Sequence, residues 1–168
     1  MTDNLVKPIA GILTSRTDVL EGVLEMMEPL FGDADIRGEL QPFTHTDYYG
    51  DEMGAGLSRC FVSFAKIVPG EAAAGFKQFA QEIECRFSAE GRRIVNIDPG
   101  YLDQSKLVLL SGKYGGHKVA LAPGVYADVL LWYNKGWQPM PWAFPDFRDG
   151  SLFLLFTKMR LAFKRQRS

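Results

Sequence analysis

Two stretches of the chain carry apolar side chains at helical spacing, and short apolar runs typical of buried strands flank each stretch. An amphipathic helix of this kind buries its apolar stripe against another layer of the fold. The two stripes consist of Leu20, Val23, Leu24, Met27, Leu30 and Phe31, and of Phe76, Phe79, Ala80, Ile83 and Phe87. The chain therefore predicts an α+β fold in which two helices cover a sheet.

The order of these segments narrows the prediction further. Strands are predicted over residues 9–13, 34–43, 58–67 and 94–97, and the two helices follow the first and third strands. Strand, helix, strand, strand, helix, strand is the order of a ferredoxin-like sandwich, with both helices on one face of the sheet. We therefore predict a ferredoxin-like βαββαβ core, a four-stranded antiparallel sheet over residues 8–98.

The C-terminal half adds elements to this core. Asp103 is positioned to cap a short helix. Residues 117–121 and 125–133 alternate as a β-hairpin does, and the apolar stripe over residues 152–163 predicts a final helix. Because no linker or repeat interrupts the chain, we expect one domain over residues 1–168.

Charge and hydropathy argue against several classes of partner. The formal net charge is −1, so neither nucleic acid nor an anionic membrane is expected as a partner. No apolar stretch approaches the ~18 residues that a membrane span requires. The N-terminus also lacks the charged start and apolar run of a signal peptide. We expect a cytoplasmic protein, and its cofactor and oligomeric state stay open.

Asn96 and Asp98 form the first candidate for chemistry. They are two residues apart on a predicted strand, so their side chains share one face. Pro99-Gly100 is predicted to turn the chain directly after them. An amide and a carboxylate at a strand end can orient a substrate or hold a divalent metal. The alternative is that Asp98 only bonds the backbone of the turn.

A glycine-rich loop over residues 44–56 is the second candidate. It carries Asp47, Tyr48, Tyr49 and Glu52. Such carboxylates can bind a ligand or metal, or transfer protons if they are partly buried. Solvated loop acids are the alternative, although adjacent tyrosines point in alternate directions and favour one packing inward.

His117 is the third candidate. If Pro123-Gly124 is a two-residue loop, Val119 lies opposite Asp128, and His117 lies diagonal to Asp128 on one sheet face. A carboxylate there would fix the imidazole tautomer. We therefore nominate His117, Asp128 and Asp98 as candidate catalytic residues. The alternative for His117 is a hydrogen-bonded structural role.

An aromatic segment over residues 137–148 contains three prolines, which stiffen it. It either wraps the sheet edge as a structural clasp or presents Trp142 and Arg148 as one wall of a pocket. With these two, the candidate ligand-binding residues are Asp47, Tyr48, Tyr49, Glu52, Asn96, Tyr101, Lys106, Trp142 and Arg148. Further cations that can bond phosphate or carboxylate are Arg59, Arg93 and Lys113.

These segments together resemble one protein family. The resemblance rests on Thr46-Asp47-Tyr48-Tyr49, on the Asn-x-Asp-Pro-Gly-Tyr-Leu stretch that begins at Asn96, and on Pro141-Trp142. Over nearly its whole length the chain resembles the bacterial domain-of-unknown-function family numbered 4416, which implies no activity or cofactor. The chain departs from the family pattern where Asp128 replaces the usual Glu, Phe147 replaces Tyr, and His45 replaces an apolar or acidic residue.

We expect a protein that binds a small anionic ligand, nucleotide-like or phosphorylated, in a polar pocket with aromatic walls. Whether it is also an enzyme stays open. One alternative is a metal-dependent hydrolase, with Asp98, Asp47 or Glu52 as metal ligands and His117 as acid or base. Such a hydrolase needs at least three metal-ligand side chains that converge on one point. A second alternative is a protein-binding adaptor, which needs an exposed apolar patch beyond a few hundred Å².

Overall fold

The computed structural model of the protein describes residues 4–44 and 48–168. Within these ranges no helix combines the length and the apolar composition that crossing a bilayer needs. The longer strands are β1 (Leu5–Thr14), β2 (Ala34–Arg37), β4 (Ser58–Phe64), β8 (Val95–Leu102), β9 (Lys106–Ser111), β10 (Val119–Ala122) and β11 (Val125–Tyr133). The short strands are β3 (Gln41–Pro42), β5 (Val68–Pro69), β6 (Ser88–Ala89), β7 (Arg92–Arg93) and β12 (Trp137–Pro139).

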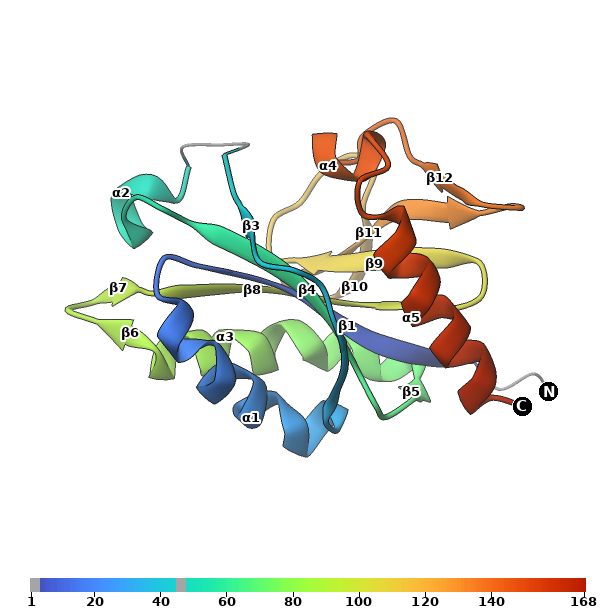
Figure 1. Cartoon of the computed structure of the whole chain (residues 1–168), viewed down its shortest axis with the longest axis horizontal. Coiled ribbons are helices and arrows are strands. Elements are labelled where there is room, and N and C mark those ends of the chain that lie inside the picture. Colours follow the sequence, from blue (N-terminus) through green and yellow to red (C-terminus); the bar gives the residue numbers. More distant parts are fainter. Residues whose placement is uncertain (1–3, 45–47) are drawn as a thin grey trace.

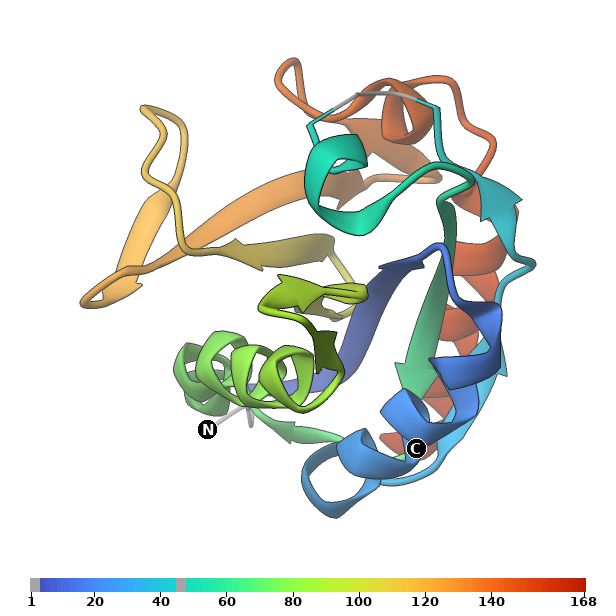
Figure 2. The same cartoon turned by 90° about the vertical axis from the view of Figure 1, so that its left-hand side faces the viewer.

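The strands form one large, curled antiparallel sheet and a separate two-stranded ribbon of β6 and β7 (Figures 1 and 2). The large sheet has ten strands in the described part of the chain. Its main order is β10-β11-β9-β8-β1-β4-β2, and β12, β3 and β5 pair with β11, β4 and β1. The helices are η1 (Thr17–Val19), α1 (Leu20–Phe31), α2 (Gly50–Met53), η2 (Gly70–Gly75), α3 (Phe76–Arg86), α4 (Pro145–Arg148) and α5 (Phe153–Gln166).

Helices α1 and α3 cover one face of the sheet, and α5 lies across the other (Figures 1 and 2). Adjacent residues of a strand point to opposite faces. Ala10 and Ile12 accordingly pack against α1 and α3, whereas Ile9 packs against α5. The central strand β1 is thus buried on both sides by two separate hydrophobic clusters.

The mixed α+β class is confirmed. Strands β8, β1, β4 and β2 are consecutive antiparallel neighbours, and the predicted segments 9–13 and 94–97 pair within one sheet, with Gly11 opposite Asp98. The hairpin of β10 and β11 and the final helix α5 are also present. The sheet is larger than the four strands predicted, however, because β3 pairs with β4, β5 pairs with β1, and β8 continues into pairing with β9. The ferredoxin-like topology is not established by this larger sheet.

The short helix predicted after Asp103 is wrong, because this segment forms the strand β9. The carboxylate of Asp103 accepts hydrogen bonds from the backbone N–H groups of Ser105 and Lys106. The same local bonds occur in a tight turn and at a helix start, so this signal does not separate the two. The segment has apolar residues on both faces, and each face packs into a different hydrophobic cluster.

The turn predicted at Pro99-Gly100 is also wrong, because β8 runs through both residues to Leu102. Pairing with β9 begins at Gly100, opposite Leu109. A Cβ atom on Gly100 would clash with the backbone oxygen of Val108. The glycine is therefore required by the close approach of a neighbouring strand and not by a reversal of the chain.

A charged residue is completely buried on the α5 face. Lys7 has 0% relative exposure. Its Nζ donates hydrogen bonds to Asp35 Oδ2 at 2.5 Å, to the backbone oxygen of Phe64 at 2.7 Å and to Gln166 Oε1 at 2.9 Å. These acceptors belong to β2, β4 and α5, so one ammonium group joins three elements to β1.

We predict that Lys7→Ala strongly destabilises the protein. Removing one partner of a buried, hydrogen-bonded ion pair leaves the other groups without compensation and costs about 3–5 kcal/mol. Urea unfolding measures this loss. Lys164→Ala, at an exposed position of α5, is the control and should change the free energy of unfolding by less than about 0.5 kcal/mol. A loss at Lys7 no larger than that of the control would contradict the prediction.

Candidate functional site

Polar side chains gather on the α5 face of the sheet. Arg59 and Asn96 lie on either side of Leu13, and Asp98 lies opposite Gly11. Directly opposed residues of paired strands point to the same face. Arg59, Asn96 and Asp98 therefore project on the same side as Ile9, which packs against α5.

Asn96 and Asp98 belong to a hydrogen-bonded group that we term the Arg93 network. Arg93 binds both carboxylate oxygens of Glu52, through Nε and Nη2, at 2.9 Å each. Its Nη1 donates to Asn96 Oδ1 at 2.9 Å and lies 3.7 Å from Glu84 Oε2. Asn96 Nδ2 in turn donates to Asp98 Oδ2 at 3.2 Å. The network thereby joins β7 and β8 to α2 and α3.

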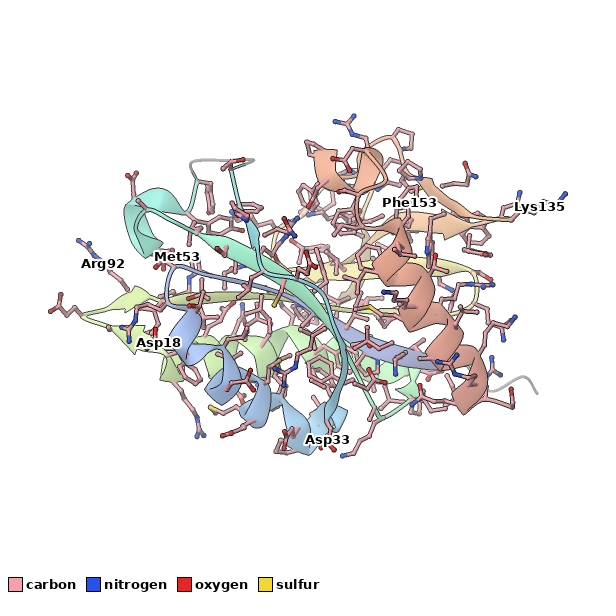
Figure 3. The ribbon with its side chains drawn as sticks, in the orientation of Figure 1. Asp18, Asp33, Met53, Arg92, Lys135 and Phe153 are labelled. Carbon is pink, nitrogen blue, oxygen red and sulfur yellow. The ribbon has the colours of Figure 1, made fainter. Side chains whose placement is uncertain are left out.

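The ribbon of β6 and β7 delivers Arg93 to this position. Arg92 points away from the body of the protein (Figure 3), and its neighbour Arg93 therefore turns toward the sheet. The turn between the two short strands uses Glu90 and Gly91 with φ of 52° and 75°. Gly91 makes this tight reversal possible, because a glycine adopts a positive φ without steric cost.

Environment shifts the pKa of three groups in or near the Arg93 network. The hydrogen bonds from Arg93 lower the pKa of the Glu52 carboxyl. Burial raises the pKa of Glu84, and this is partly opposed by the hydrogen bond that its Oε1 accepts from the Ile97 N–H. Burial, followed by the charge of Asp98, raises the pKa of Tyr49 to about 12. Tyr49 is thus a neutral hydroxyl at physiological pH.

The two adjacent tyrosines differ in environment, as predicted. Tyr49 packs against a small cluster that contains Leu13, Met53 and Leu57, whereas Tyr48 is exposed. The Nζ of Lys113 donates to the Tyr48 hydroxyl at 2.5 Å. This contact links the segment before α2 to the loop after β9. Asp47, nominated with the tyrosines, lies outside the described residues.

His117 and Asp128 lie together, with Trp142 beside them; we term these three residues the His117 cluster. His117 Nε2 is 3.5 Å from Asp128 Oδ2, and the imidazole stacks on the Trp142 ring at 5.1 Å. The predicted register was one residue off, since Val119 lies opposite Ala127. A bulge in β10 and the loop before it still bring His117 to the carboxylate.

Arg59 lies between two aromatic rings at the edge of a cavity. Its guanidinium carbon is 4.9 Å from the ring centroids of both Phe43 and Phe61, and it forms an ion pair with Asp146 of α4. Burial lowers the pKa of Arg59. The cavity has a volume of about 640 Å³ and lies between β3 and β4 on one side and α4 and α5 on the other. Asp146 and Phe43 were missed from the sequence, because only the fold brings them to Arg59.

The remaining nominated residues do not join these groups. Tyr101 faces α1 and α3, on the opposite side of the sheet from Asp98. Lys106 forms an ion pair with Asp103 at 2.5 Å. Arg148 is an exposed residue of α4. Among the residues that the structure describes, no three His, Cys, Asp or Glu side chains meet as a metal site would require.

The opposite pKa shifts in the Arg93 network lead to a prediction on pH dependence. The pKa of Glu84 is raised above its ordinary value of 4.5, so the folded protein holds this proton more tightly than the unfolded chain. Stability should then fall as pH rises from 4.5 through the folded-state pKa. The pKa of Glu52 is lowered, so the stability that its charge contributes is lost only as pH falls below 4.5 through its folded-state pKa.

Glu84→Gln keeps an oxygen for the Ile97 N–H but removes the charge, so this variant should lack the loss of stability that Glu84 causes at rising pH. Urea unfolding across about pH 4.5 to pH 7 measures the difference from wild type. Glu82→Gln, at an exposed position of the same helix, is the control and should run parallel to wild type. If the free energy of unfolding changes with pH in the same way for Glu84→Gln and wild type, burial of the Glu84 charge does not lower stability, which contradicts the prediction.

The comparisons with known proteins give one match. Residues 4–163 match the family described as Domain of unknown function (DUF4416). No curated protein and no solved structure gives a significant match. The matched range includes β1 through most of α5, and with them the Arg93 network, the His117 cluster and Arg59. The chain belongs to the DUF4416 family.

Proposed function

We propose that the protein binds a small anionic ligand in the cavity between β3–β4 and α4–α5. The observation that carries this proposal is the state of Arg59. Its side chain is only 16% exposed, yet it borders a cavity of about 640 Å³. Ligand pockets commonly measure roughly 300–1,000 Å³ and hold a few polar groups among apolar walls.

The side chain of Arg59 is already fixed in an orientation that can bind an anion. Contacts with Phe43 and Phe61 fix the plane of its guanidinium. The Nη2 atom faces Asp146, and the charge of Asp98 also acts on the guanidinium. A guanidinium fork binds a carboxylate or phosphate through two parallel N–H groups. Since Arg59 is already fixed, little side-chain entropy is lost on binding.

The rest of the lining favours a ligand with an apolar part. Lys158 of α5 and Arg37 of β2 add cationic groups to the lining, and Arg37 also pairs with Glu21. Glu39 and Asp149 are exposed acids of the same lining. The ring of Phe43 and the side chain of Leu155 provide apolar wall. A phosphorylated or nucleotide-like compound, whose anionic end meets Arg59 and whose ring meets Phe43, suits this combination.

The two alternatives have less support. A metal-dependent hydrolase needs three converging ligands, and residues 4–44 and 48–168 contain no such group. An adaptor needs a contiguous apolar patch, whereas Trp142 and Phe144 are the exposed members of a segment whose Trp137 and Phe147 are buried. For the framework we infer a ferredoxin-like core, which is supported by the order β8-β1-β4-β2 and by the packing of both α1 and α3 against one face.

A thermal screen with nucleotides, sugar phosphates and small carboxylates tests the binding. A ligand at about 100 times its dissociation constant stabilises the folded state by about 2.7 kcal/mol, which raises the melting temperature by several degrees. For any compound that does so, Lys158→Glu should weaken binding by roughly three- to tenfold, because it reverses one charge at the rim. Isothermal titration measures the affinity.

Lys164→Glu is the matched control, since it reverses an exposed lysine of the same helix that does not line the cavity. It should leave the affinity unchanged. If Lys158→Glu and Lys164→Glu behave alike, the ligand binds elsewhere. If no compound shifts the melting temperature, the proposal fails for these classes of ligand.

A further inference from the structure

Asp128 is a buried acid on the α5 face of the sheet. Its side chain is 9% exposed, and it projects beside Leu109, which lies directly opposite it on β9. Its Oδ1 atom is buried and has no hydrogen-bond partner. A buried carboxylate oxygen without a partner is costly, and a neutral or apolar residue would fit a purely structural role better.

The nearest counter-charges to Asp128 come from the loop between β9 and β10. Burial raises the pKa of Asp128, and the neighbouring His117 and Lys118 oppose this effect. Lys118 is occupied, because its Nζ donates to Ser111 Oγ at 3.2 Å and to the backbone oxygen of Lys113 at 3.1 Å. His117 is therefore the group that is placed to pair with the charge of Asp128.

The imidazole of His117 is fixed on two sides. Its Nε2 faces Asp128 Oδ2 at 3.5 Å. Its ring lies nearly parallel to that of Trp142, at an angle of 22°. Trp142 is itself held by a hydrogen bond from its Nε1 to the backbone oxygen of Val129 at 2.9 Å. The other ring nitrogen, Nδ1, bonds to no described group, and the side chain is 34% exposed.

We propose that the His117 cluster is a site of proton transfer that hydrolyses small esters or related acyl compounds. His117 is the catalytic residue and Asp128 is the positioning residue. With Nε2–H directed to Asp128, the lone pair of Nδ1 points away from the carboxylate and toward solvent. Asp128 also stabilises the imidazolium that forms when Nδ1 takes up a proton.

The step balances without any further reactant. Nδ1 removes a proton from water as the water oxygen forms a bond to the acyl carbon. The bond from that carbon to the leaving oxygen then breaks, and the electron pair departs with the oxygen. His117 returns its proton to this oxygen, so ester and water yield acid and alcohol and the imidazole is neutral again.

This site is independent of the ligand cavity. His117 lies between β9 and β10, and Asp128 lies on β11, whereas the cavity is formed by β3, β4, α4 and α5. Failure of either proposal therefore leaves the other standing.

Hydrolysis of p-nitrophenyl acetate by the whole protein tests the proposal. The chain has two histidines, so His45→Gln is the matched control for His117→Gln. We expect His117→Gln and Asp128→Asn each to lower kcat/KM by roughly tenfold or more, since a positioned acid or base contributes about 10²–10⁴-fold. We expect His45→Gln to match wild type. Asp128→Glu keeps the carboxylate and should retain most of the rate.

Four outcomes would overturn the proposal. The wild-type rate could equal that of free imidazole at the same concentration, or His117→Gln could hydrolyse the ester as wild type does. Alternatively, Asp128→Asn could leave the rate unchanged, or Asp128→Glu could fail to restore it, and Asp128 would then have no positioning role. Melting temperatures of all variants separate a loss of rate from a loss of folding.

Discussion

The packing of α5 against the sheet depends on the hydrogen bonds that the ammonium group of Lys7 makes. A charge with 0% exposure is tolerated only if every donor finds an acceptor, and Lys7 meets three, from β2, β4 and α5. Asp35 reaches it because the pairing of β2 with β4 shifts register between Ala34 and Ile36. Asp35 also accepts a bond from Ser63 Oγ at 2.6 Å. The irregularity in an edge strand therefore serves to aim a carboxylate at a buried cation.

The position of the cavity at Arg59 follows from this contact. Gln166 is the last residue of α5, and it both accepts a bond from Lys7 and donates one to the backbone oxygen of Ala65. The C-terminal end of α5 is thereby fixed on β1 and on the residue that follows β4, while its apolar side packs on the sheet through Phe156, Met159 and Phe163. Helix α4 precedes α5 by a few residues and carries Asp146. The ion pair of Asp146 with Arg59 thus depends on where α5 lies.

The fold was predictable where the signal is periodic and local. Both striped helices, the strands around them and the final helix follow from apolar spacing, whereas β9 and the continuation of β8 do not. A short apolar run such as Leu107 to Leu110 has the same composition in a buried strand and in a buried helix. Pro99-Gly100 is a common turn pair, but here the glycine admits the backbone of Val108. Only the position of the neighbouring strand distinguishes these cases, and a local sequence pattern does not contain that position.

The candidate sites also divide into those that a local sequence pattern predicts and those that it does not. Asn96 and Asp98 share a face because they are two residues apart on a strand, and His117 meets Asp128 because one hairpin joins them. Arg93 and Glu52 are 41 residues apart, and no local pattern announces their bidentate pair. Arg59 and Asp146 are further apart still, and their contact requires α4 to lie beside β4. The His117 cluster is therefore held largely by one hairpin and the segment that follows it, whereas the cavity at Arg59 depends on the whole arrangement that begins at Lys7.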